Sequence, residues 1–148
     1  MYKQILVPID GSDAAQRGLE EAIALARHLG ASLRLMHVVD PIAVYIGMSS
    51  LASLPEGVLE LREDGERLLK EGLALATKAG VKADIHLEEC PAPNVGKLIV
   101  EAAQRWPADL VVMGTHGRKG VRHVVLGSDA EDVVRRSPVP VLLVRATA

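Results

Sequence analysis

The chain has 148 residues, of which 49% are hydrophobic and 24% are charged, and this composition is typical of about one globular domain. The formal net charge of -2 gives no reason to expect nucleic acid or an anionic membrane as a general partner. The single cysteine, Cys90, excludes an intramolecular disulfide and a thiolate metal site, and no run approaches 18 apolar residues, so we expect a cytoplasmic protein without a membrane span or a signal peptide.

The first 38 residues predict a strand, a helix and a second strand. Residues 3–9 are expected to form the first strand, and the following turn offers Ser12 or Asp13 as the N-cap of a helix whose apolar residues recur with the helical period. Gly30 fits the position just after the end of this helix, and residues 32–38 follow as a strand. Two strands joined by one helix should be parallel, with a right-handed crossover.

Residues 39–57 form a long connection that is difficult to interpret. Prolines, glycines and serines interrupt any period, but the segment is too apolar for a solvated linker. Connections of this length inside a compact domain are usually lids, binding loops or interface segments. Three interpretations stay open: the segment packs over the edge of the sheet, closes over a ligand, or contacts a partner.

A long helical stripe begins at Val58 and carries Gly65 and Gly72 on its apolar face. Each of these glycines costs about 1 kcal/mol relative to alanine, so we expect that a close approach of the helix to the sheet compensates for them. Residues 82–88 alternate as a third strand, and a helix from about residue 95 to residue 106 follows.

A glycine-rich loop follows a fourth apolar strand at residues 108–113. Its glycines, at positions 114, 117, 120 and 127, remove side chains where backbone N–H groups could approach an anion, and they permit turns with positive φ. The S-x-x-E sequence from Ser128 to Glu131 fits a capping box, so we expect Ser128 to start a helix whose N-terminus points at the same anion. The sequence therefore predicts a phosphate cradle.

The last strand is expected from Val139 to Val144, after Pro138 has stopped the preceding helix. Strands and helices thus alternate along the whole chain, and this order predicts a single α/β domain over residues 1–148 with a mostly parallel sheet. Periodicity alone does not give the order of the strands.

The spacing Gly-x-x-Gly, nine residues, then Gly-Ser resembles the ATP-binding motif of the universal stress protein family, and in particular of its ATP-binding subgroup. The resemblance extends to Ile5-Leu6-Val7-Pro8-Ile9-Asp10-Gly11-Ser12, Leu35-Met36-His37-Val38 and Pro138-Val139-Pro140-Val141-Leu142-Leu143-Val144, so it covers the whole chain. It implies an open, Rossmann-like sheet, similar to the adenine nucleotide alpha hydrolase-like fold, with strand order 3-2-1-4-5 and helices on both faces. Ligands of such sheets bind outside the carboxyl ends of the strands, where the order reverses.

The resemblance also implies a set of residues that bind the nucleotide. These residues are Pro8, Asp10, Val38, Met113, Gly114, Thr115, His116, Gly117, Arg118, Lys119, Gly120, Gly127, Ser128 and Asp129. By resemblance, the backbone of Val38 reads the adenine edge, Pro8 packs near it, and Asp10 lies on the ribose, adenine or metal side. Asp10 could instead be a turn residue that bonds its own backbone.

Asp129 departs from the family pattern, in which a small or apolar residue commonly follows Gly-Ser. A carboxylate at this position lies at the positive end of a helix, where it is intrinsically stabilised. It could compete with phosphate, or it could join Asp10 and phosphate oxygens around Mg²⁺. We assign no catalytic residue, because no general base or nucleophile is specified beside the cradle.

These observations favour an ATP-binding regulatory or stress-response protein with at most slow ATP hydrolysis. Two alternatives stay open: an ATP-using enzyme, such as a nucleotidyl transferase or hydrolase on the same fold, and an interaction module that binds no nucleotide. The last strand is short and apolar, and strands of this kind invite pairing when they lie at an edge. The family typically dimerises through this strand, so the resemblance implies a two-fold homodimer.

Overall fold

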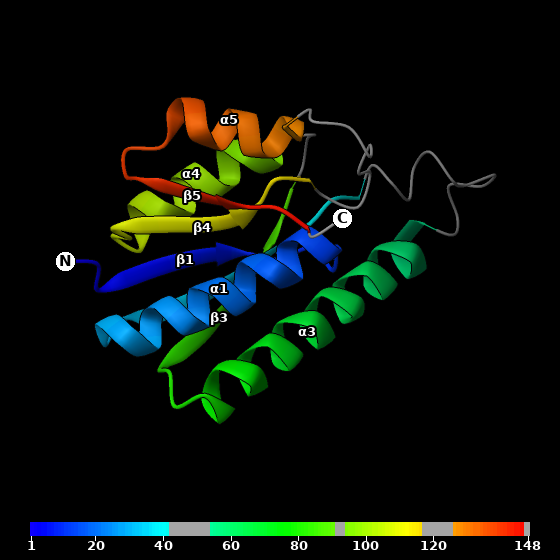
Figure 1. Cartoon of the computed structure of the whole chain (residues 1–148). Helices are drawn as coiled ribbons and strands as arrows, with labels where there is room; N and C mark the ends of the chain where they lie inside the picture. The colour runs from blue at the N-terminus through cyan, green and yellow to red at the C-terminus, as the bar shows by residue number, and fades with distance from the viewer. Residues whose placement is uncertain (42–53, 91–93, 117–125, 147–148) are drawn as a thin grey trace.

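A parallel sheet of five strands forms the centre of the molecule (Figure 1). The computed structural model describes residues 1–41, 54–90, 94–116 and 126–146. The strands are β1 (Gln4–Pro8), β2 (Ser32–Val39), β3 (Ala83–Glu89), β4 (Leu110–Gly114) and β5 (Val141–Val144). They are arranged in the order β3-β2-β1-β4-β5, and each neighbouring pair is parallel. The expected fold class and strand order are therefore confirmed.

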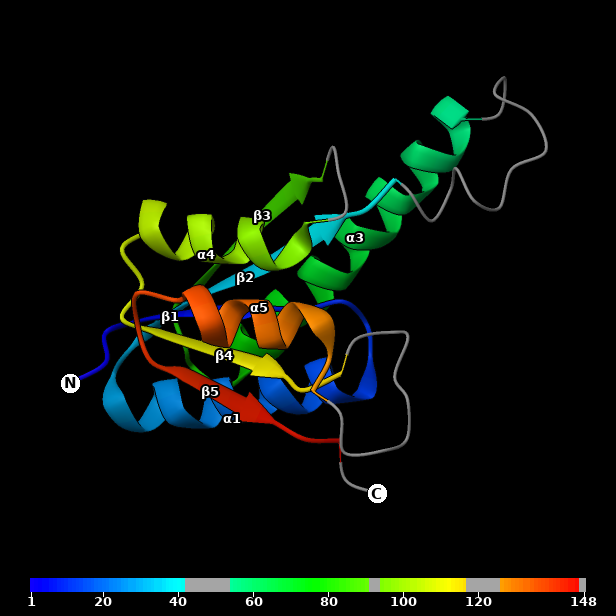
Figure 2. The same ribbon diagram turned by 90° about the horizontal axis from the view of Figure 1, so that it is seen from above.

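Helices cover both faces of the sheet, as Figures 1 and 2 show. One face carries α1 (Asp13–Leu29) and α3 (Leu54–Lys78), and the other carries α4 (Val95–Arg105) and α5 (Ser128–Arg136). None of the helices in the described part of the chain combines the length and the apolar character needed to cross a membrane.

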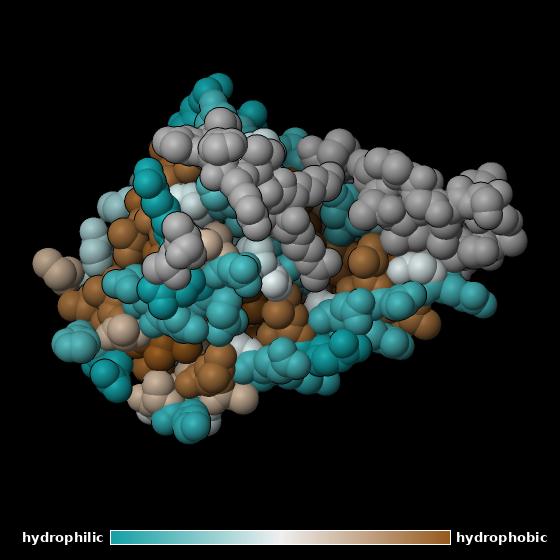
Figure 3. Space-filling view, turned by 45° about the vertical axis from the view of Figure 1, so that its right-hand side comes forward, coloured by the Kyte–Doolittle hydropathy of each residue, from teal (hydrophilic) through white to brown (hydrophobic). Residues whose placement is uncertain are grey.

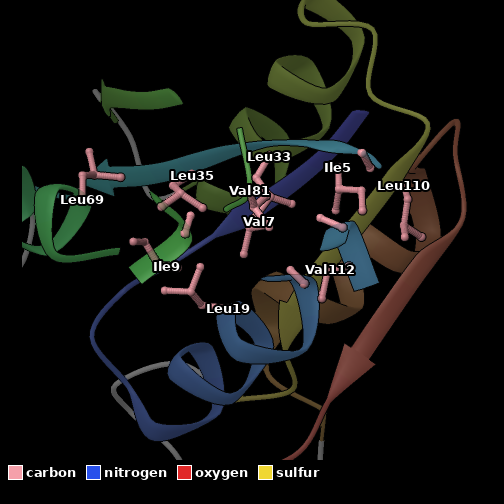
Figure 4. Close-up of a cluster of buried hydrophobic side chains, with 14 residues drawn as sticks. Ile5, Val7, Ile9, Leu19, Leu33, Leu35, Leu69, Val81, Leu110 and Val112 are labelled. Atoms are coloured by element: carbon pink, nitrogen blue, oxygen red, sulfur yellow. The ribbon is translucent and has the colours of Figure 1, made fainter. Parts of the chain in front are cut away.

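The core has two layers because successive side chains of a strand point to opposite faces. Ile5 and Val7 of β1 lie in the cluster beneath α1 and α3, which Figure 4 shows, whereas Leu6 lies in the cluster beneath α4 and α5. All three side chains are fully buried. An apolar run without alternation is therefore the pattern that a strand covered on both faces requires.

The ends of α1 follow from local chemistry. The Ser12 hydroxyl oxygen accepts a hydrogen bond from the Ala15 N–H at 3.1 Å, so Ser12, one of the two expected N-caps, caps this helix. Gly30 adopts φ 67° at the other end, a left-handed conformation that glycine takes without steric cost.

The long helix α3 begins four residues earlier than Val58, at Leu54. A Cβ on Gly65 would lie 2.5 Å from Cδ2 of His37, and one on Gly72 would lie 2.9 Å from Cδ1 of Leu35. These distances confirm the expected close approach of the helix to the sheet. The glutamates on the outer side of the helix are exposed, and Figure 3 shows hydrophilic side chains along the lower edge of the molecule, where α3 runs. Residues 42–53, most of the uncertain connection, lie outside the described residues, so its three interpretations stay predictions.

The last strand is shorter than expected, because it begins at Val141 and not at Val139. The Val139 N–H donates to the Ser137 hydroxyl oxygen at 3.2 Å, and the Ser137 hydroxyl donates to the Val139 carbonyl at 2.7 Å. This local turn uses both backbone groups of Val139, which is why the residue does not join the sheet.

Candidate functional site

The order of the strands reverses between β1 and β4. The two strands pair directly, with Ile5 opposite Leu110, and the chain continues from β1 toward β2 but from β4 toward β5. Figure 2 shows that α1, α4 and α5 all begin at the end of the sheet to which these strands point. Loops and helix N-termini therefore meet where ligands of open α/β sheets bind.

Two loops at this edge are joined by a hydrogen bond. The Ser12 hydroxyl donates to the carbonyl of His116 at 3.2 Å, which ties the loop after β1 to the loop after β4. Asp10 accepts the Ser12 N–H at 2.9 Å through Oδ1, and Gly11 between them has φ 82°. The interpretation of Asp10 as a turn residue is confirmed, and its contact with a nucleotide stays a prediction.

The end of β4 lies directly against the first turn of α1. A Cβ on Gly114 would lie 2.6 Å from the carbonyl carbon of Ala14 and 2.7 Å from the nitrogen of Ala15. Neither Gly114 nor Gly127, which has φ -58°, uses the positive φ that glycine permits; among the described residues positive φ occurs at Gly11, Gly30 and Gly80. Gly114 is thus required for the approach of two backbones.

Ser128 starts α5, as expected, but the capping box expected there does not form. The N-cap is Gly127, which makes no side-chain cap bond, and Ser128 is the first residue of the helix. The N–H of Gly127 donates to the carbonyl of Thr115 at 2.8 Å, and this tertiary bond fixes Gly127 as the last extended residue. Glu131 forms an ion pair with Arg135 at 2.8 Å in place of a capping role. The helix N-terminus therefore starts without a side-chain acceptor on its cap residue.

Asp129 links α5 to α4. Its carboxylate accepts a hydrogen bond from the backbone N–H of Gly96, in the first turn of α4. Asn94, the N-cap of α4, makes no side-chain cap bond, so Asp129 supplies an acceptor that Asn94 does not. Burial of the carboxylate raises the pKa of Asp129, the negative charges of Asp10 and Asp132 raise it further, and the bond from Gly96 only partly opposes them. Much of the residue is nevertheless exposed, so solvent screens these charges in part.

A cavity of about 300 Å³ lies between the first turns of α4 and α5. Its lining residues are Asn94, Gly96, Ser128, Asp129, Glu131, Asp132 and Arg135. Gly96 has no room for a side chain here, because a Cβ would lie 2.8 Å from Cβ of Asp132. No sequence pattern indicates this role of Gly96 and Asp132, since their contact depends on how two helices approach one another.

The Thr115 side chain is buried at the end of β4, with 7% of the residue exposed. Its N–H donates to the carbonyl of Val144 at 2.9 Å, and its carbonyl accepts from Gly127. Its hydroxyl, in contrast, has no hydrogen-bond partner in the described structure. A buried polar group without a partner is uncommon and calls for an explanation.

Of the other expected binding residues, three lie in the described part of the chain and four lie outside it. Pro8 ends β1 beside Met36 of β2, Val38 is half-buried near the end of β2, and Met113 lies in the core cluster beneath α4 and α5. Gly117, Arg118, Lys119 and Gly120 lie outside the described residues.

The described residues contain no group of three or more histidine, cysteine, aspartate or glutamate side chains placed to hold a metal ion. The expected pair, Asp10 and Asp129, is close enough for the charge of Asp10 to raise the pKa of Asp129. Carboxylate oxygens suit Mg²⁺, but two carboxylates need further oxygens to complete its octahedron. Any Mg²⁺ between them would therefore draw its remaining ligands from phosphate or water.

Comparison with known proteins gives matches over nearly the whole chain. The model of the Universal stress protein family matches residues 1–145. Universal stress protein MJ0531 of Methanocaldococcus jannaschii is 36% identical, over 98% of this chain and 83% of that protein. The solved structure of protein MJ0577 is 26% identical, with a TM-score of 0.84 over 100% of this chain and 99% of that one. A universal stress protein solved in complex with cAMP is 25% identical, with a TM-score of 0.70 over 99% of this chain and 98% of that one.

Proposed function

Because the chain belongs to the universal stress protein family, we propose that its principal act is to bind an adenine nucleotide, ATP in the first instance, as a regulatory or stress-response protein. The observation that carries this proposal is the convergence of the β1 and β4 loops at the point where the strand order reverses. The Ser12 hydroxyl joins the loop after β1 to the loop after β4 there, and the Gly127 N–H bonds the end of the β4 loop back to Thr115 at its start. The cAMP complex of a structural relative supports an adenine nucleotide as the class of ligand.

The phosphates are assigned to the N-terminus of α5. The N-cap Gly127 makes no side-chain cap bond, and the first-turn N–H groups of a helix, together with its positive dipole end, suit an anion. Arg118 and Lys119 are proposed to balance phosphate charge, and Val38 to meet the adenine. Mg²⁺, where present, is proposed to arrive with the phosphates and to contact Asp10 and Asp129.

Ligand titration tests the proposal. We expect ATP at about 100 times its Kd to stabilise the protein by about 2.7 kcal/mol, which for a chain of this length raises the Tm by roughly 5–10 °C. The measurement is thermal unfolding with ATP, ADP, AMP and cAMP, with and without Mg²⁺, together with mass spectrometry of any small molecule that copurifies. An unchanged Tm and no copurified nucleotide would favour the interaction module. ATP turnover above about 1 s⁻¹ would favour the enzyme.

We further propose a two-fold homodimer through the last strand. β5 lies at one edge of the sheet, and Leu142 on it is 38% exposed although it is apolar. We expect light scattering to give about twice the chain mass of 15.8 kDa, and Leu142→Lys to give one chain per particle. Ile85→Lys is the matched control, because Ile85 is 37% exposed on β3 at the opposite edge. A wild-type monomer at micromolar concentration, or equal effects of the two variants, would contradict this interface.

A further inference from the structure

A second cavity, of about 180 Å³, lies between α1 and α3, the two helices on one face of the sheet (Figure 1). Its floor includes Ile9, directly after β1, and Leu19 of α1, which are 5% and 2% exposed. A Cβ on Gly72 of α3 would lie 3.3 Å from Cδ2 of Leu19 and 3.5 Å from Cδ1 of Ile9. Leu68 and Leu75 of α3 add to the apolar lining. Because residue 72 has no side chain, part of the space between the two helices stays open.

This cavity is separate from the proposed nucleotide site. The cavity beside Ser128 and Asp129 lies between α4 and α5, on the opposite face of the sheet, and the two cavities share no lining residue. In the described part of the chain, none of the residues expected to bind the nucleotide lines the cavity between α1 and α3. A molecule bound here would therefore be a second ligand, and it would not compete with the nucleotide for the same side chains.

Two polar side chains, one from each helix, lie at the rim of this cavity. Gln16 of α1 and Glu71 of α3 both line it, and both residues are exposed. Among the described residues, Glu71 has no ion-pair partner, and neither lysine nor arginine lines the cavity. A carboxylate without a neighbouring cation thus stands beside an apolar floor. This combination suits a molecule that has an apolar body and a positively charged end.

The volume of the cavity sets the size of that molecule. An apolar cavity of about 150 Å³ in another protein holds benzene, so about 180 Å³ admits one six-membered ring or a branched alkyl group of similar volume. We propose that the cavity between α1 and α3 binds a small organic cation, a primary amine that carries one such apolar group. The apolar group lies on Ile9 and Leu19, and the ammonium lies between the Gln16 amide oxygen and the Glu71 carboxylate. This inference does not depend on nucleotide binding.

Benzylamine is the test ligand, because it joins one ring to one ammonium group. We expect NMR titration of the full chain to give a Kd of about 1 mM, with amide shifts at Gly11, Leu68 and Leu75, which line the cavity. Benzyl alcohol has nearly the same shape without the charge, so it should bind about three-fold more weakly. Glu71→Gln keeps the shape of the side chain and removes its charge. This variant should bind benzylamine about three-fold more weakly than the wild type does and should bind benzyl alcohol equally well.

Glu66→Gln is the matched control, because Glu66 is an exposed carboxylate of the same helix that does not line the cavity. It should leave the affinity for benzylamine unchanged. Ala15→Leu tests the apolar part of the site, since Ala15 lines the cavity and is 5% exposed. The larger side chain should fill the space and weaken the binding of both test ligands by about ten-fold or more.

Three results would overturn this proposal. The first is the absence of any shift in the wild type at about 10 mM benzylamine. The second is a set of shifts at Gly96 and Ser128 in place of Gly11 and Leu75, which would put the amine in the acidic cavity between α4 and α5. The third is an equal affinity of E71Q and E66Q for benzylamine, since the site would then not select a cation.

Discussion

Replacement of Gly114 with alanine is expected to lower the free energy of unfolding by about 2–4 kcal/mol. The new Cβ would lie 2.6 Å from the carbonyl carbon of Ala14 and 2.7 Å from the nitrogen of Ala15, and both are backbone atoms that no change of rotamer can remove. α1 or β4 would have to move, although each is packed in the core. Thermal or urea unfolding should show the loss, which corresponds to a Tm lower by roughly 5–15 °C.

Gly18→Ala is the matched control, because Gly18 lies on the other side of the same contact. A Cβ there would lie 3.3 Å from the nitrogen of Gly114, which is tight but tolerable, and alanine gains about 1 kcal/mol of helix propensity. We therefore expect G18A to have nearly the stability of the wild type. If G114A proves as mild as G18A, β4 can move away from α1, and the stated reason for this glycine is wrong.

The elements of the fold could be predicted because the signals for them are local. The run from Ile5 to Val7 is apolar on both faces, as a central parallel strand must be, and Ser12 and Gly30 bound α1 by their own conformational preferences. The strand order did not come from periodicity. It was implied by resemblance to the family, and the pairing of β1 with β4 confirms it.

The local rules failed where tertiary contacts decide the structure. The S-x-x-E pattern correctly placed the start of α5 at Ser128, but the capping box does not form, because Gly127, which bonds to Thr115, takes the cap position. Gly114 is required by the backbone of α1, and Gly96 by Asp132, and neither neighbour is adjacent in sequence. A sequence pattern shows that a glycine is present, but the reason for it depends on segments that meet only in the folded chain.

Asp129 also illustrates this limit, and it carries the second large prediction. We expect Asp129→Asn to tighten the binding of metal-free ATP by about ten-fold, because the wild-type carboxylate adds a negative charge where the phosphates are proposed to lie. Asparagine keeps an oxygen that can accept the Gly96 N–H, so the link to α4 is preserved. Mg²⁺ screens the same repulsion, so it should increase the ATP affinity of the wild type more than that of the variant. Calorimetry should therefore give a smaller ratio of the ATP affinity in Mg²⁺ to the ATP affinity in EDTA for D129N than for the wild type.

Glu131→Gln is the matched control, since it removes the same charge from an exposed side chain of the same turn that is paired with Arg135. The E131Q variant should keep nearly the wild-type ratio of ATP affinity in Mg²⁺ to ATP affinity in EDTA. If E131Q and D129N act alike, the effect is one of net charge and not of position. If D129N instead weakens binding only with Mg²⁺, Asp129 is a metal ligand and not a competitor of phosphate.

The raised pKa of Asp129 fixes the direction of the pH dependence. Its causes are burial and the charges of Asp10 and Asp132, so the folded protein holds this proton more tightly than the unfolded chain does. The ionised form therefore destabilises the protein above the folded-state pKa, and stability rises as the pH falls through that value toward the unfolded value of 3.8. D129N should exceed the wild type in Tm at neutral pH, and the two should converge once the wild-type carboxylate is protonated. The ATP affinities of the two proteins should converge over the same pH range. Protonation of Asp129 removes the negative charge that both destabilises the folded protein and repels the phosphates.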